Sequence, residues 1–97
     1  MNPKLKNENN DALVDAILSL KDREECYRFF EDLCSVSELK SITQRFAVAR
    51  MLHDGKVYSE IVETTGASTA TSSRVNRALT GGCDAFKMVF DRLEQGE

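Results

Sequence analysis

The sequence predicts an all-α protein with six helices, on three observations. Its 97 residues include one proline, five glycines and no tryptophan, a composition that favours helices over a strand-rich sandwich. Apolar residues recur at spacings of three and four, the period of a helix packed on one face. Residue pairs typical of helix starts precede several of these stripes. Hydrophobic residues make up 41% of the chain, enough for a core, and no apolar run approaches the ~18 residues of a membrane span.

The first ten residues are polar and predict a disordered tail, which leaves residues 11–97 as a single helical domain. The tail has no apolar segment of the kind that a secretory signal peptide needs. The three cysteines are odd in number and lack metal-ligand spacing, so they predict unpaired thiols and no metal site. We therefore expect a cytoplasmic protein without disulfides.

The first two expected helices are short and apolar on one side. Asn10 or Asp11 can cap the first, and Asp22 with Glu25 gives a capping-box signature for the second. Their apolar stripes are Leu13, Val14, Ile17 and Leu18 in the first helix, and Cys26, Phe29, Phe30 and Leu33 in the second. Isolated helices of this length are marginal in water, so we expect residues 11–34 to pack against a second copy of the chain.

A long third helix and a last helix complete the frame. Ser35 with Glu38 repeats the capping-box signature, and Gly55 suits a left-handed end to the third helix. The pair Gly81-Gly82 breaks the chain, after which Asp84 can cap the last helix. The apolar stripes are Leu39, Ile42, Phe46, Ala49 and Leu52 in the third helix, and Phe86, Val89, Phe90 and Leu93 in the last.

The segment between these helices has the pattern of a helix-turn-helix. Two short helices, about Ser59–Thr65 and Thr69–Leu79, flank a tight turn that contains Gly66. We expect Ile61, Val62 and Ala67 to face the core beside the turn, and Val75 and Leu79 to anchor the second helix. Ser72 is left open: it either lies in a loosely packed helix or is solvated.

The second of these helices begins with small hydroxyl residues, which let a helix N-terminus approach a DNA backbone closely. Arginine and asparagine in the following turns can pair with guanine and adenine. The candidate DNA-binding residues are Ser68, Thr69, Ala70, Thr71, Ser73, Arg74, Asn76 and Arg77. The alternative is that the hydroxyl-rich start is only a helix cap with solvated side chains, and the motif only a packing element.

The charge distribution fits a nucleic-acid partner. The net charge of −3 is an average over −3 for residues 1–34, +2 for residues 35–83 and −2 for residues 84–97. Between Gly66 and Cys83 the charged residues are two arginines, so the candidate reading helix is positive on an acidic body.

Six motifs follow one another along the middle of the chain: SVSE (35–38), TQRF (43–46), MLHDG (51–55), YSEI (58–61), TGASTAT (65–71) and SRVNRAL (73–79). In order and spacing they resemble the tryptophan repressor superfamily, in particular its YerC/YecD-type branch. The resemblance extends over about Leu33–Leu93. It implies a six-helix fold in an intertwined homodimer, operator binding through the second helix of the helix-turn-helix, and transcriptional repression.

The resemblance also implies a small-ligand site at Arg45 and Arg74, whose guanidinium groups can bind a carboxylate or stack on an aromatic ring. Two neighbours depart from the family pattern. The branched side chain of Val75 would intrude on an indole ring, and Ala78 cannot hydrogen-bond a ligand amine. These departures argue against tryptophan as corepressor and leave another amino acid, or no cofactor, as the expectation. The alternative is that both arginines make salt bridges or phosphate contacts.

We therefore expect a homodimeric transcriptional regulator, a repressor, that binds double-stranded operator DNA and has no membrane partner. The chain has no catalytic constellation, which disfavours an enzyme. The alternative is a helical dimerisation or adaptor module that keeps the helix-turn-helix without reading DNA. The acidic total charge favours this alternative, as do Glu60 and Glu63 on the first helix of the motif, where they would repel phosphates.

Overall fold

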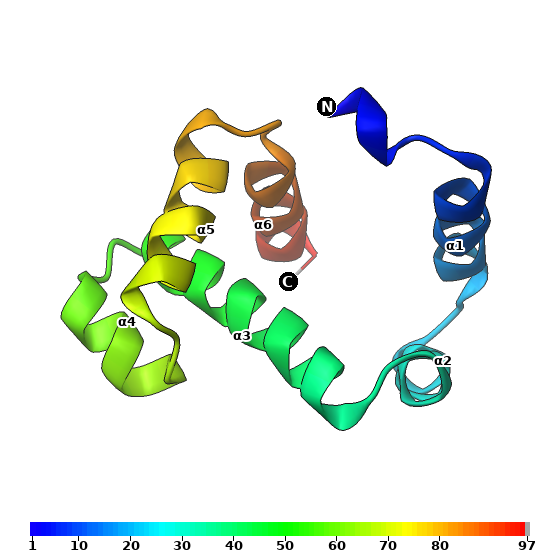
Figure 1. The fold of residues 1–97 in the computed structure, drawn as a ribbon, viewed down its shortest axis with the longest axis horizontal. Coiled ribbons are helices and arrows are strands. Elements are labelled where there is room, and N and C mark those ends of the chain that lie inside the picture. The colour runs from blue at the N-terminus through cyan, green and yellow to red at the C-terminus, as the bar shows by residue number, and fades with distance from the viewer. Residues whose placement is uncertain (97) are drawn as a thin grey trace. The chain divides into compact units, whose positions relative to one another are not determined.

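The computed structural model describes residues 1–96, and these contain only helices and their connections (Figure 1). A short 3-10 helix at Pro3–Leu5 precedes six α-helices: α1 (Glu8–Ser19), α2 (Arg23–Leu33), α3 (Val36–His53), α4 (Tyr58–Thr65), α5 (Thr69–Gly81) and α6 (Ala85–Gln95). The predicted six-helix, all-α fold is confirmed. None of these helices is long and apolar enough to cross a membrane. The chain divides into two compact units, Met1–Leu39 and Lys40–Glu97, which are described in turn.

The first unit begins its α-helical structure earlier than predicted. The side chain of Asn7 accepts a hydrogen bond from the backbone N–H of Asn10, with 2.8 Å between Oδ1 and N, and so caps α1 at Glu8. The expected caps at Asn10 and Asp11 are therefore wrong, because both residues lie inside the helix. Residues 8–10, which the sequence assigns to the tail, are helical.

Both helix starts are capped at the predicted residues, but only the box at Ser35 is complete. The Asp22 carboxylate accepts from the Glu25 backbone N–H at 2.8 Å, and the Glu25 carboxylate accepts from the N–H of Lys21 at 2.9 Å. At the start of α3 the bonds are fully reciprocal, because Glu38 N–H donates to Ser35 Oγ at 3.1 Å and Ser35 N–H donates to Glu38 Oε1 at 2.9 Å. These bonds hold the pKa of the Glu38 carboxyl below its ordinary value, since they favour the charged form.

The helices of the first unit, α1 and α2, bury no residue completely. The apolar stripe of α1 lies on the surface, and its most exposed member is Leu18, at 76%. In α2, Leu33 is 49% exposed and the rest of the stripe is half-buried. Phe29 and Phe30 are half-buried and meet edge to face, with 5.8 Å between ring centroids. The first unit therefore has amphipathic helices but no enclosed core.

The second unit has a core to which all four of its helices contribute. The buried residues of this core are Val48, Ala49, Ile61, Ala67, Val75 and Phe90. One part of the predicted pattern is wrong: Ile42 of the expected α3 stripe is 52% exposed, whereas Val48, outside that stripe, is completely buried. The reason is that the core packs on α3 over residues 46–52, where it covers more than one face of the helix.

Glycines lie at the C-terminal ends of α3 and α5. At Gly55 the backbone is left-handed, and the N–H groups of Gly55 and Lys56 donate to the carbonyls of Leu52 and Met51, each at 3.0 Å. This is a Schellman end, as predicted. Helix α5 runs on to Gly81, two residues beyond the predicted end.

The predicted cap of the last helix is wrong. Asp84 does precede α6, but its side chain makes no cap hydrogen bond. Its backbone is left-handed, with φ of +62°, whereas a capping side chain normally requires an extended backbone at that position.

Candidate nucleic-acid interface and the adjoining pocket

The turn between α4 and α5 is fixed by backbone and side-chain hydrogen bonds. Gly66 adopts φ of +73° and donates its N–H to the Val62 carbonyl at 2.9 Å, which ends α4. The Thr65 hydroxyl donates to the Ile61 carbonyl at 2.7 Å and accepts from the Ala67 N–H at 3.1 Å. The turn therefore has a defined shape, with Gly66 in the left-handed conformation that glycine adopts readily.

Two of the predicted DNA-binding residues form the start of α5. The Ser68 hydroxyl oxygen accepts from the Thr71 backbone N–H at 3.1 Å, and the same hydroxyl donates to Thr71 Oγ1 at 3.1 Å. Ser68 is thus the cap that the alternative interpretation describes, and Thr71 is its partner. Both side chains are occupied with the helix start.

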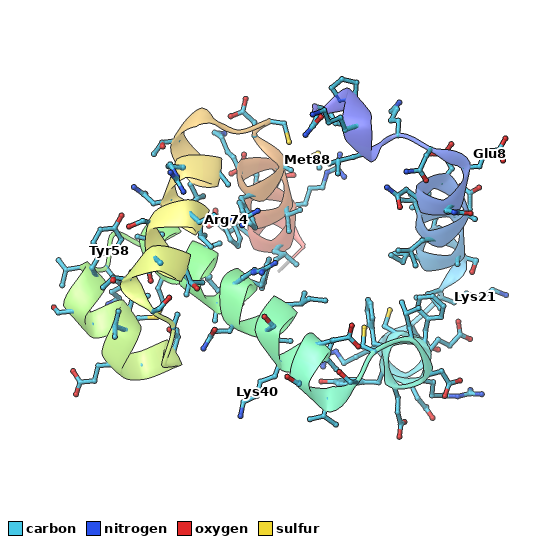
Figure 2. All side chains as sticks on the ribbon, viewed as in Figure 1. Glu8, Lys21, Lys40, Tyr58, Arg74 and Met88 are labelled. Atoms are coloured by element: carbon cyan, nitrogen blue, oxygen red, sulfur yellow. The ribbon has the colours of Figure 1, made fainter. Side chains whose placement is uncertain are left out.

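Five of the other predicted residues share one exposed face of α5. They lie at positions 69, 70, 73, 74 and 77, and this spacing places them on one side of a helix. We call this set the α5 face: Thr69, Ala70, Ser73, Arg74 and Arg77. Figure 2 shows Arg74 on this helix and Tyr58 at the start of α4. Asn76, the remaining predicted residue, is half-buried, and its carbonyl accepts from the Thr80 hydroxyl at 2.9 Å.

The opposite face of α5 packs into the core and includes Ser72, whose environment the sequence left open. This side chain is completely buried, so it is not solvated. Within the described residues its hydroxyl oxygen has no hydrogen-bond partner. A buried hydroxyl without a partner loses the hydrogen bonds it would make with water, so Ser72 is a weak point of the core.

The two arginines of the α5 face are not paired with acidic side chains of the described residues. Across residues 1–96, neither Arg74 nor Arg77 forms an ion pair. Glu60, the acidic residue expected to repel phosphates, lies 4.0 Å from Lys56 at the start of α4, which offsets its charge. Glu63 is exposed and has no such partner within the same stretch.

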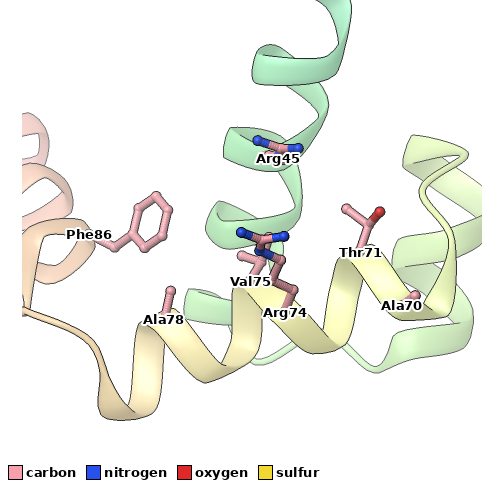
Figure 3. Close-up of a pocket in the computed structure, with 7 residues that line it drawn as sticks. All are labelled: Arg45, Ala70, Thr71, Arg74, Val75, Ala78 and Phe86. Carbon is pink, nitrogen blue, oxygen red and sulfur yellow. The ribbon is translucent and has the colours of Figure 1, made fainter. Parts of the chain in front are cut away.

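A pocket of about 340 Å³ lies between α3, α5 and α6 (Figure 3). Its lining residues are Arg45, Ala70, Thr71, Arg74, Val75, Ala78 and Phe86. The structure thus brings the two predicted ligand arginines together, and neither forms an ion pair within residues 1–96. Val75 belongs to the core, is 6% exposed, and also lines the pocket.

Phe86 is a lining residue that the sequence places only in the apolar stripe of the last helix. It is half-buried, and Figure 3 shows its ring reaching into the pocket from α6. Its helical spacing is that of a core residue, and it does pack against Phe90, with 6.1 Å between ring centroids. No local pattern distinguishes this double role. Among residues 1–96 no group of three or more His, Cys, Asp or Glu side chains is arranged to hold a metal ion.

A sequence profile described as Trp repressor protein matches residues 8–94, almost the whole chain. The chain belongs to the Trp repressor family. Membership of this family indicates a non-enzymatic, DNA-binding regulator with a helix-turn-helix. In the structure the corresponding unit is α4, the turn at Gly66 and α5.

The chain is also similar to individual proteins and solved structures. The uncharacterized protein YerC of Bacillus subtilis is 54% identical over 94 residues, which cover 97% of this chain and 90% of YerC. The crystal structure of a TrpR-like protein from Eubacterium eligens has 54% identity and a TM-score of 0.91, and the match covers 96% of both chains. That of a Trp repressor candidate from Staphylococcus aureus has 52% identity and a TM-score of 0.89, covering 94% of this chain and 91% of the other.

Proposed function

We propose that the protein is a homodimeric transcriptional repressor that binds operator DNA through the α5 face. The observation that carries this proposal is the composition of that face. It consists of small residues, which allow close approach to DNA, together with Arg74 and Arg77, which are exposed and free of ion pairs within residues 1–96. Small side chains and arginines on one exposed helix face suit the major groove.

A dimer gives this weak positive patch enough affinity. One α5 face carries two cations, whereas two copies present four, and neutralising phosphates is the main source of DNA affinity. In a twofold dimer the two α5 helices would read half-sites about one helical turn apart. The exposed stripe of α1 and the incompletely buried stripe of α2 support the dimer, because a second copy would supply the apolar surface that covers them. The proposal places the protein in the cytoplasm, where its three thiols stay reduced.

Selection of binding sequences from a random pool of DNA tests the proposal. We expect an enriched palindrome with half-sites about ten base pairs apart. Recovery of no enriched sequence would favour the adaptor alternative, in which the helix-turn-helix is kept without reading DNA. A sequence that is enriched but not palindromic would contradict the dimeric part of the proposal.

The variant Arg77→Ala tests the role of the α5 face on the selected DNA. Losing one phosphate contact per protomer should weaken binding about tenfold and lower the salt slope by about two for the dimer. Lys87→Ala is the matched control, since it removes the same charge from α6, where Lys87 pairs with Asp91 at 2.9 Å. Equal effects of the two variants would show that only net charge matters.

We also propose that the pocket beside Arg45 and Arg74 binds a small carboxylate, such as an amino acid, that modulates DNA binding. Its volume of about 340 Å³ lies at the lower end of the range for small-ligand sites, and two unpaired guanidinium groups suit a carboxylate. Repeating the DNA selection with each amino acid, tryptophan included, tests this. An effector should change the affinity for wild type but not for Arg45→Gln. No change with any amino acid would contradict the proposal.

A further inference from the structure

One side chain of α3 is bonded to the turn that precedes α5. Gln44 is half-buried, and its Nε2 donates a hydrogen bond to the carbonyl oxygen of Thr65 at 3.1 Å. Thr65 is the last residue of α4, so its carbonyl is one of the four that a helix end leaves without an intrahelical partner. The Gln44 amide therefore supplies the hydrogen-bond donor that α4 itself cannot provide to the Thr65 carbonyl.

The neighbouring N–H groups of the turn go elsewhere. Gly66 N–H donates to the Val62 carbonyl and Ala67 N–H to the Thr65 hydroxyl, so neither is available to the Thr65 carbonyl. Gln44 is also the nearest neighbour of the turn glycine. Its Nε2 lies 3.9 Å from the point where a Gly66 side chain would begin, and no other group comes within 4 Å of that point apart from adjoining residues. The Gln44 amide is thus both the hydrogen-bond partner and the packing neighbour of the turn.

From these contacts we infer that Gln44 is a positioning residue for DNA recognition, which fixes the direction in which α5 leaves the turn. This inference rests on the proposed function. Base contacts require the reading helix to be correctly oriented, whereas phosphate contacts tolerate small rotations of long side chains. Gln44 should therefore act on sequence discrimination more than on affinity for DNA in general. Arg45, the next residue of α3, lines the pocket together with Arg74 of α5.

The test compares Gln44→Met with Gln95→Met. Methionine has a similar length and no amide, and Gln95 is an exposed glutamine on α6. Affinity for the selected operator and for a scrambled duplex is measured over a range of salt concentrations. For Gln44→Met we expect the ratio of the two affinities to fall about fivefold, the scale of one lost hydrogen bond. The salt slope should not change, because no charge is removed. Gln95→Met should match wild type in both measurements.

Amide hydrogen exchange shows separately whether the turn loosens. In Gln44→Met the amides of Gly66 and Ala67 should exchange several-fold faster, while those of Gly55 and Lys56, at the other end of α3, stay unchanged. Faster exchange with an unchanged affinity ratio would mean that Gln44 only stabilises the fold, and would overturn the inference. Equal loss of operator and scrambled binding would overturn it too. If wild type itself prefers no sequence, the proposed function fails, a result distinct from failure of Gln44→Met alone.

Discussion

The two compact units of this chain differ in how completely they bury their apolar side chains. In residues 40–96 four helices enclose Val48, Ile61 and Phe90, so the unit has a core within a single chain. In residues 1–39 the helices also have apolar stripes, yet none of the residues of α1 or α2 is completely buried. The contrast shows that an apolar stripe identifies an amphipathic helix, but not whether the rest of the same chain buries it.

Charge follows the same division. Residues 1–39 carry a net charge of −4, whereas residues 40–97 carry +1 and include the exposed arginines of the α5 face. A unit that is acidic and rich in exposed apolar side chains suits a protein partner, and a unit with free arginines suits a polyanion. The two units therefore differ in the surface that they offer as well as in how they are packed.

The largest expected effect comes from a charge in the stripe of α1. Ile17 is 40% exposed in one chain, and in the proposed dimer a second copy would cover it. Ile17→Asp would place an unpaired carboxylate there twice per dimer, so the dimer dissociation constant should rise at least about a hundredfold. Analytical ultracentrifugation measures this constant directly.

The control for this variant is Ala12→Asp on the opposite side of α1, which adds the same charge outside the stripe and should leave the dimer intact. If Ile17→Asp associates as wild type does, the stripe of α1 is not an interface. The first unit would then lack a core even in solution, and the comparison drawn above would fail.

A smaller effect, of opposite sign, is expected in the core of the second unit. Ser72→Ala removes the buried hydroxyl that has no partner within the described residues, and should raise the free energy of unfolding by about 1–2 kcal/mol. Ser73→Ala, its exposed neighbour, changes helix propensity alone and should add only about 0.5 kcal/mol. Urea unfolding of the two variants isolates the contribution of burial. Equal shifts for both would mean that the Ser72 hydroxyl is satisfied in solution.

The smallest effect concerns the pH dependence of stability at the start of α3. The capping bonds from Ser35 hold the pKa of Glu38 below its ordinary value in the folded protein. The stabilisation from this charge is therefore present above the unfolded-state pKa and is lost as the pH falls through the lower, folded-state pKa. In urea unfolding Glu38→Gln should be slightly less stable than wild type at pH 7 and equal to it in strong acid.

Glu31→Gln is the control for this pH prediction, since Glu31 is exposed in α2 and makes no side-chain hydrogen bond within residues 1–96. A difference between Glu38→Gln and wild type that persists in strong acid would mean that the lost charge is not its cause.

Features encoded by neighbouring residues could be predicted from the sequence. The helix starts at Asp22 and Ser35 depend on residues three positions apart, and both side chains cap their helices. The end of α3 at Gly55 and the turn at Gly66 depend on single glycines, and both glycines have a left-handed backbone. Arg45 and Arg74 line one pocket, as the family resemblance implies. Asn7 was missed because Asn10 and Asp11 offered equally good local caps, and nothing in the sequence ranks the three.

The remaining features depend on contacts between distant parts of the chain. The bond from Gln44 to Thr65 spans 21 residues, and no periodicity or motif marks it. Ser72 is a polar residue in a buried position, against the usual preference, so hydropathy alone could not place it. Phe86 has the spacing of a core residue and packs as one, and only the assembled helices show that it also faces the pocket.

The two faces of α5 have separate duties. Val75 packs in the core and Ser72 is buried beside it, whereas the five residues of the α5 face are exposed. Substitutions on an exposed helix face usually change stability by less than about 0.5 kcal/mol. The exposed residues of α5 can therefore change during evolution without changes in the buried residues that hold the fold together. If the α5 face reads DNA as proposed, this helix is the place to retarget the protein to a new DNA sequence by exchanging a few side chains.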